Sequence, residues 1–205
     1  APLQASSRPC RRSSTRTWCA SATAGASFSA TVAALDAYGN VATGYLGTVH
    51  FSSTDAAANL PSDYAFSGAD AGVHSFSGVA LKTAGTRSLT ATDTVTAAVT
   101  GTTSGIAVSP AAAASLSVTA PGSAGAGTPF TVTVTALDAF ANTATGYAGT
   151  IHFTSTDPGA TLPANYTFTA GDSGVLSNAT AATQIYALSP LAALPICNAA
   201  ITGTT

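Results

Sequence analysis

The chain has 205 residues and few ionic side chains: Lys, Arg, Asp and Glu together make up 7% of it, and neither Glu nor Met occurs. From Ser21 onward two basic residues stand against eight Asp, a balance of 2 − 8 = −6, which would repel phosphate backbones and disfavours nucleic-acid binding. The apolar fraction of 46% disfavours disorder, and no apolar run is long enough to cross a bilayer, so we expect no membrane insertion.

The first twenty residues differ in composition from the rest of the chain. They hold four of the six basic residues, a run too short and too poor in aromatics to serve as a nucleic-acid-binding arm, and no secretory leader is recognised there. They also hold two of the three cysteines, which are Cys10, Cys19 and Cys197. A Cys10–Cys19 disulfide stays open, and the odd count leaves at least one free thiol.

Strand signals begin after this segment. Residues alternate between apolar and polar in Ser27–Asp36 and again in Gly47–Ser53, where Val49 and Phe51 share one face, and this pattern predicts half-buried strands. Further short strands are predicted around Tyr64 and Phe66, and at Val73–Phe76, Val79–Lys82, Thr86–Asp93, Ala97–Thr102 and Gly105–Ser109. Seven or eight short strands at regular spacing are typical of an antiparallel β-sandwich of immunoglobulin type.

The same text is then repeated at an offset of 138 − 36 = 102 residues. Ala24–Ser75 and Ala126–Ser177 align without a gap, with 30 identities in 52 positions. A repeat of this length indicates tandem domains. We therefore predict an all-β chain of two tandem immunoglobulin-like antiparallel β-sandwiches, at residues 21–110 and 111–205, joined by a short linker and placed end to end.

Three short motifs resemble bacterial immunoglobulin-like tandem repeats. They are the run Leu35–Asn40 with its D-x-x-G-N turn, the Gly44–Phe51 segment with its T-V-x-F strand, and Leu81–Gly85. Such repeats are modules of large surface or secreted proteins, including invasin- and intimin-type adhesins. The resemblance covers Ala22 to about Ser177, and also Asn198–Thr205. It implies an extracellular stalk, spacer or adhesive role.

The repeat fails in two places. Residues 1–20 show no text like the strand Leu116–Thr119, so we expect the first copy to lack that strand. In the second copy, residues 178–197 replace the strands equivalent to Phe76–Asp93, and the register returns at Ala199. From this replacement we expect exposed sheet edges, an apolar surface and aggregation in the second copy.

Both breaks have a common explanation at the level of DNA. Arg11-Arg12-Ser13-Ser14 can be encoded by CGA CGC TCT TCC, and these bases in another frame, continued by GATC, encode Asp-Ala-Leu-Pro-Ile, close to Ala192–Ile196. That string is the end of a common sequencing adapter, so both segments are interpreted as assembly artefacts. Genuine divergence of terminal repeats is the alternative.

Histidine and aspartate are the candidate ligands. His50 and His152 occupy matched strand positions with no metal-ligand spacing, so they are interpreted as surface residues and no metal site is predicted. Five residues could gather at one end of a sandwich as a structural calcium site, although turn capping is the simpler interpretation: Asp36, Asn40, Asp55, Asp70 and Asp93.

No catalytic or cofactor-binding residue is predicted. The chain has no G-x-S-x-G elbow and no carboxylate pair for glycoside hydrolysis. Aromatic residues that recur in both copies are assigned to the core rather than to a sugar platform: Tyr45, Tyr64, Phe66, Tyr147, Tyr166 and Phe168. The sequence therefore predicts a non-enzymatic stalk or adhesive module of a bacterial extracellular protein, whose partners are neighbouring repeats and, in adhesion, a cell-surface protein or glycan. An accessory carbohydrate-binding or positioning module of a secreted enzyme is the alternative.

Overall fold

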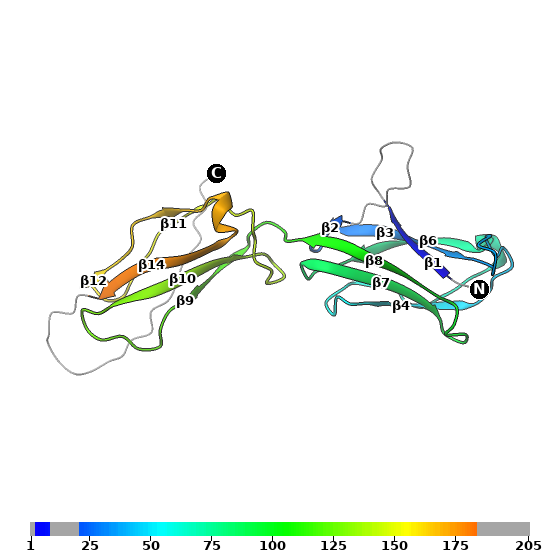
Figure 1. Ribbon diagram of the computed structural model, residues 1–205, viewed down its shortest axis with the longest axis horizontal. Coiled ribbons are helices and arrows are strands. Elements are labelled where there is room, and N and C mark those ends of the chain that lie inside the picture. Colours follow the sequence, from blue (N-terminus) through cyan, green and yellow to red (C-terminus); the bar gives the residue numbers. More distant parts are fainter. Residues whose placement is uncertain (1–2, 9–20, 184–205) are drawn as a thin grey trace. The chain divides into compact units, whose positions relative to one another are not determined.

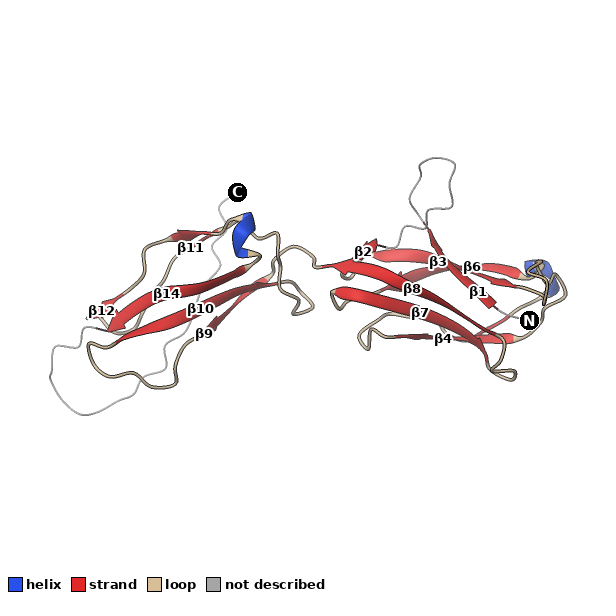
Figure 2. Cartoon of the chain, in the orientation of Figure 1, coloured by secondary structure: helices blue, strands red, loops and turns tan. Residues whose placement is uncertain are grey.

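The computed structural model describes residues 3–8 and 21–183, and the chain divides into two compact units, unit 1 (Ala1–Ser109) and unit 2 (Pro110–Thr205) (Figure 1). Regular structure in the described residues is β apart from two single 3-10 turns, η1 (Gly68–Asp70) and η2 (Ala170–Asp172) (Figure 2). The predicted all-β class is therefore confirmed. No helix among the described residues is long and apolar enough to span a membrane.

Unit 1 consists of two sheets. Three strands form one sheet in the order β1-β3-β6, and five form the other in the order β2-β8-β7-β4-β5. Their bounds are β1 Leu3–Arg8, β2 Ser21–Thr23, β3 Ser27–Ala34, β4 Thr48–Ser53, β5 Tyr64–Ala65, β6 Val73–Ala80, β7 Gly85–Asp93 and β8 Thr100–Ser109.

Among the described residues of unit 1, all strand pairs except one are antiparallel. Strand β2 runs parallel to β8, with Ser21 opposite Ala107 and Thr23 opposite Ser109. The Ala24 amide extends this pairing by donating to the Ser109 carbonyl at 2.8 Å. The first and last strands of the five-stranded sheet in chain order are thus joined side by side.

The core of unit 1 follows the predicted alternation. On β3 the side chains of Ala30, Val32 and Ala34 are fully buried, and on β4 Val49 and Phe51 are buried while the residues between them face outward. Strands β6, β7 and β8 add further buried side chains, namely Phe76, Val79, Leu89, Ala91, Ile106 and Val108, and Leu81 is buried directly after β6. Each buried Val, Leu, Ile or Phe side chain among them contributes about 1.5–3 kcal/mol when it leaves water.

Two strands are longer than the sequence predicts. Val73–Phe76 and Val79–Lys82 are joined in β6, and Gly105–Ser109 is continuous with the preceding residues in β8. The pairing register shifts at Gly78 and at Gly105, and both glycines have positive φ, 77° and 79°. Each glycine therefore forms a β-bulge, which adds one residue without reversing the chain.

Unit 2 repeats part of this plan. One sheet has the order β12-β14-β10-β9, and strands β11 and β13 form a second pair. Their bounds are β9 Ser115–Thr119, β10 Pro129–Leu137, β11 Thr150–Ile151, β12 Ala160–Thr161, β13 Tyr166–Thr167 and β14 Val175–Thr183. Its core contains Val132, Val134, Ile151, Phe168 and Leu176.

The prediction that no strand precedes Ser21 is wrong. Strand β1 pairs with β3 in the register that β9 has with β10. Leu3 lies opposite Ala34, and Leu116 lies opposite Ala136, the residue that matches Ala34 at the repeat offset of 102. Sequence comparison missed the strand because the chain between it and the matched glycine-rich turn is longer by (24 − 3) − (126 − 116) = 11 residues. The strand is therefore present, displaced along the sequence.

The second break also begins later than predicted. Residues 178–183 continue β14 and pair with β10 down to Ala182 opposite Pro129. The backbone thus follows β6 of unit 1 through this stretch. The rest of the replaced segment, the three cysteines and the expected apolar surface at Ile185, Tyr186, Leu188, Leu191 and Leu194 lie outside the described residues.

Candidate functional site

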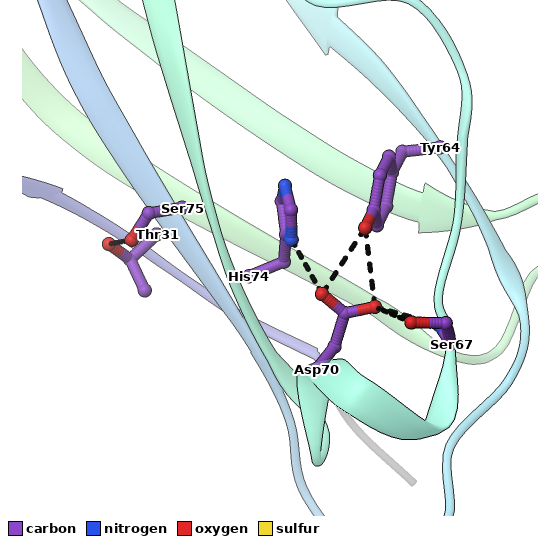
Figure 3. Close-up of polar contacts among 6 residues, drawn as sticks. All are labelled: Thr31, Tyr64, Ser67, Asp70, His74 and Ser75. Atoms are coloured by element: carbon purple, nitrogen blue, oxygen red, sulfur yellow. Dashed lines mark hydrogen bonds and ion pairs between the residues drawn. The ribbon is translucent and has the colours of Figure 1, made fainter.

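A cluster of four polar or aromatic side chains lies at the η1 turn of unit 1 (Figure 3). The Asp70 carboxylate accepts hydrogen bonds from the Ser67 amide at 2.7 Å and from the Ser67 hydroxyl at 2.8 Å, which closes a capping box over this turn. It also accepts from the Tyr64 hydroxyl at 3.2 Å, and His74 Nδ1 lies 2.7 Å from it. The Tyr64 and His74 rings are stacked, with centroids 4.0 Å apart.

These contacts set the ionisation of the cluster. Hydrogen bonds from Ser67 first, and then from His74 and Tyr64, hold the pKa of Asp70 well below its usual range. Desolvation and the adjacent Asp70 raise the pKa of Tyr64. Three of the four positions recur in unit 2, but Leu176 replaces the histidine. The cap is therefore a shared structural device, and only unit 1 has a histidine in it.

A hydrogen bond between a tyrosine and a second aspartate, Tyr45 and Asp93, joins two loops of unit 1. The Tyr45 hydroxyl donates to Asp93 at 2.5 Å, and the Asp93 carboxylate also accepts from the amides of Val95 and Thr96. The hydrogen bond from Tyr45 is the main reason that the pKa of Asp93 is lowered, and desolvation followed by the bond to Asp93 raises the pKa of Tyr45. Gly47 lies directly against both side chains. The Tyr45–Asp93 hydrogen bond thus holds the loop that leads into β4.

Asp55 holds a third loop. Its buried carboxylate accepts from the amides of Ala57, Lys82 and Thr83 and from the Thr83 hydroxyl, at 2.6–3.0 Å. Burial raises its pKa, but the bonds from Thr83, Lys82 and Ala57 outweigh that effect and hold the pKa at about 2. Two residues of the Leu81–Gly85 motif noted in the sequence, Lys82 and Thr83, thus bind this carboxylate.

The D-x-x-G-N turn of unit 1 has the same geometry as residues 138–142 of unit 2, where Ala141, with a φ of 64°, replaces Gly39. In unit 1, Asp36 Oδ1 accepts from the amides of Tyr38 and Asn40 at 2.9 and 2.8 Å. In unit 2, Asp138 Oδ1 accepts from the amides of Phe140 and Asn142 at 2.8 and 2.9 Å. The turn-capping interpretation of this aspartate is supported by these contacts.

The candidate calcium ligands of unit 1 do not form one site. Each of the four aspartates accepts hydrogen bonds from a different set of loop residues; they are Asp36, Asp55, Asp70 and Asp93. No group of three His, Cys, Asp or Glu residues that could hold a metal ion occurs within residues 3–8 and 21–183. Every buried side-chain nitrogen or oxygen in that part of the chain has a hydrogen-bond partner.

The matched histidines are exposed, as the strand alternation predicts. His50 Nδ1 lies 2.6 Å from Asp63, and His152 Nδ1 lies 2.6 Å from Asn165. Both members of the first pair are more than half exposed, at 60% and 54%, so this contact contributes little to stability.

The repeated aromatics pack inside the units rather than forming a platform. Phe66 and Phe168 are 3% and 2% exposed. Tyr45 and Tyr64 meet Phe66 edge to face, with ring centroids 5.1 and 5.6 Å apart, and Tyr147 meets Phe168 in the same way at 5.0 Å. Edge-to-face contacts of this kind stabilise a core.

Sequence reasoning missed rows of hydroxyl groups on the outer face of the five-stranded sheet. Two threonine pairs are in contact across β7 and β8, Thr90 with Thr102 and Thr92 with Thr100, each at 2.9 Å. The β4 residues Ser52 and His50 lie opposite Thr90 and Thr92 and lengthen the rows. The T-x-T spacing of both strands was the available signal, because residues two apart share a face.

Comparison with known proteins gives one distant structural likeness. No protein-family model and no curated protein matches the sequence. Among solved structures, the Yersinia pseudotuberculosis adhesin InvE is similar with a TM-score of 0.41 and 17% sequence identity, over 89% of this chain and 51% of that chain. The chain thus spans about half the length of that structure, and the likeness is too low to carry a functional argument.

Proposed function

We propose that this chain is a non-enzymatic repeat module of a large bacterial extracellular or cell-surface protein, in which two tandem immunoglobulin-like sandwiches serve as a stalk or spacer for adhesion. The repeat of 102 positions and the resemblance of its turn and strand motifs support an array of like domains. Neighbouring repeats of the same protein are the proposed partners, and the module requires no cofactor.

The parallel pairing of β2 with β8 carries the stalk proposal. Once β1 has separated from β3, tension on the two ends of unit 1 pulls β2 and β8 in opposite directions along their common axis. The hydrogen bonds of Ser21–Thr23 with Ala107–Ser109 are then loaded together, in shear, instead of opening one after another. A domain with this arrangement resists extension, which is what a stalk requires.

The use of the polar side chains supports a non-enzymatic role. Asp55, Asp70 and Asp93 are held by loop amides and hydroxyls, and their pKa values are lowered rather than raised. General acid–base catalysis near neutral pH favours the opposite, a carboxyl whose pKa is raised toward the working pH.

Single-molecule force spectroscopy on the full chain, held by its two ends, tests the stalk proposal. We expect a discrete force peak followed by a gain in length of roughly 260 Å, the extended length of the residues between β2 and β8. Smooth extension without a peak for unit 1 would reject the mechanical role.

The hydroxyl rows favour a second candidate, carbohydrate binding. Four threonines on β7 and β8 present their hydroxyls on the outer face of the sheet, and His50 and Ser52 continue the rows. A glycan microarray probed with the full chain separates the candidates. Binding that is lost in a Thr90→Val/Thr92→Val variant would favour the carbohydrate module, and no binding to any glycan would leave the stalk.

A further inference from the structure

In unit 2 the turn at residues 138–142 receives the segment that leads into the unit. The Ala111 amide donates to Asp138 Oδ2 at 2.9 Å, and the Ala114 amide donates to the Leu137 carbonyl at 2.7 Å. Asp138, Asn142 and Ala144 are 3%, 9% and 1% exposed. We call these three positions the linker socket.

Unit 1 has the same socket, already formed. Its members are Asp36, Asn40 and Ala42. The Asp36 amide donates to the Asn40 carbonyl at 2.8 Å and the Ala42 amide to the Ala34 carbonyl at 2.8 Å. The matching bonds of unit 2, from Asp138 to Asn142 and from Ala144 to Ala136, measure 2.9 and 2.8 Å. No rearrangement is needed for this socket to accept a segment.

The socket of unit 1 is uncovered. Asn40 is exposed, and Asp36 and Ala42 are half-buried, whereas all three matching positions of unit 2 are buried. Asp36 Oδ2 accepts from Asn40 Nδ2 at 3.1 Å, and no other donor to it occurs within residues 3–8 and 21–183. The matching Asp138 Oδ2 accepts both from Asn142 Nδ2 and from the Ala111 amide.

Exposed apolar side chains flank this socket. Tyr38 in the turn is 90% exposed and Val41 beside it is 44% exposed. The residue matching Tyr38 in unit 2, Phe140, is 39% exposed. An incoming segment bound at Asp36 would cover part of this apolar surface, as Pro110–Ala114 lies beside the less exposed Phe140 turn in unit 2.

We propose that the linker socket of unit 1 binds an extended segment of small residues that leads in from another repeat of the same kind, as Pro110–Ala114 does in unit 2. Strands β1 and β9 have the same register, so the donor is the backbone amide five positions before Leu3, as Ala111 lies five before Leu116. Each repeat thus anchors the linker that precedes it through its own aspartate. This inference rests on the proposed array function and names the contact that joins its members.

The test places a copy of Ser109–Ser115 directly before Leu3 in the full chain, in place of the first two residues. A control chain carries Ala111→Pro in that copy, which removes the donor amide and leaves the rest unchanged. We expect amide exchange at the copied alanine to be at least about tenfold slower than in an unstructured peptide, and the extended chain to melt at a higher temperature than the proline control. Asp36→Asn should abolish both effects in the extended chain.

Equal melting of the alanine and proline chains, together with unprotected exchange at the copied alanine, would overturn the proposal. Exchange at Ala111 in the same chain serves as the internal reference, because its acceptor Asp138 is already in place. A protected amide in a chain that shows no force peak would reject the stalk role and leave the socket standing.

Discussion

At the scale of single residues, aspartate orders the loops of unit 1. Asp55, Asp70 and Asp93 each accept hydrogen bonds from two or more groups of a nearby or distant loop. Sequence reasoning predicted the turn-capping role, because Asp favours turns. It could not name the partners, since Thr83 is 28 positions from Asp55 and Asp93 is 48 from Tyr45.

Asp55→Asn should destabilise unit 1 at neutral pH. The carboxylate accepts from four donors, and a hydrogen-bonded buried charge of this kind is worth about 2 kcal/mol. Its folded pKa of about 2 lies below the ordinary 3.8, so the stabilisation is complete above about pH 4 and is lost as the pH falls toward 2. Urea unfolding at pH 7 and across this range measures both effects.

Asp157→Asn is the matched control for that experiment. Asp157 occupies the same position in unit 2, and within residues 3–8 and 21–183 its carboxylate accepts from the Gly159 amide, at 2.9 Å. We expect a loss of only about 0.5–1 kcal/mol, typical of one loop hydrogen bond. Equal losses for the two variants would show that the contacts with Lys82 and Thr83 add nothing.

At the scale of elements, the start of β4 depends on a glycine. Gly47 immediately precedes the strand, and a Cβ at this position would collide with Asp93 Oδ2 and the Tyr45 hydroxyl. The Phe66 amide also donates to the Gly47 carbonyl, at 3.0 Å. Unit 2 has a glycine at the matching position, Gly149, and a Cβ there would collide with the Tyr147 side chain in the same way.

Gly47→Ala should therefore lower the unfolding free energy of unit 1 by about 1–3 kcal/mol, the usual effect of forcing extra atoms into a packed site. Thermal unfolding followed by tyrosine fluorescence measures it. Gly44→Ala is the control, because nothing lies within 4 Å of a Cβ there. If both variants melt together, the Tyr45–Asp93 pair does not constrain this loop.

Strand positions were predictable where the alternation is regular, and their limits were not. Val49 and Phe51 are buried as their spacing indicates. Gly78 was interpreted as part of a break between strands and Gly105 as the start of a separate strand, yet each forms a bulge within one strand. Glycine permits a turn and a bulge equally well, so local sequence does not distinguish them; the pairing partner does.

At the scale of the whole molecule, the repeat was the strongest guide and also a source of error. It predicted which loops of the two units would match, as the Asp36 and Asp138 turns do. It concealed β1, because a comparison at one fixed offset cannot follow a strand displaced by eleven residues. The pairing of β2 with β8 could not be predicted either, since a three-residue strand has no readable alternation.

The measurement that tests the account most directly compares the unfolding forces of Ala22→Pro and Ser21→Pro in the full chain. The Ala24 amide points to β8, and amides two residues apart point the same way, so the Ala22 amide faces β8 and the Ser21 amide faces away. Proline at position 22 removes a hydrogen bond that is loaded in shear. We predict a lower unfolding force for Ala22→Pro and a nearly unchanged one for Ser21→Pro. Equal forces for both variants and the parent chain would contradict the stalk role.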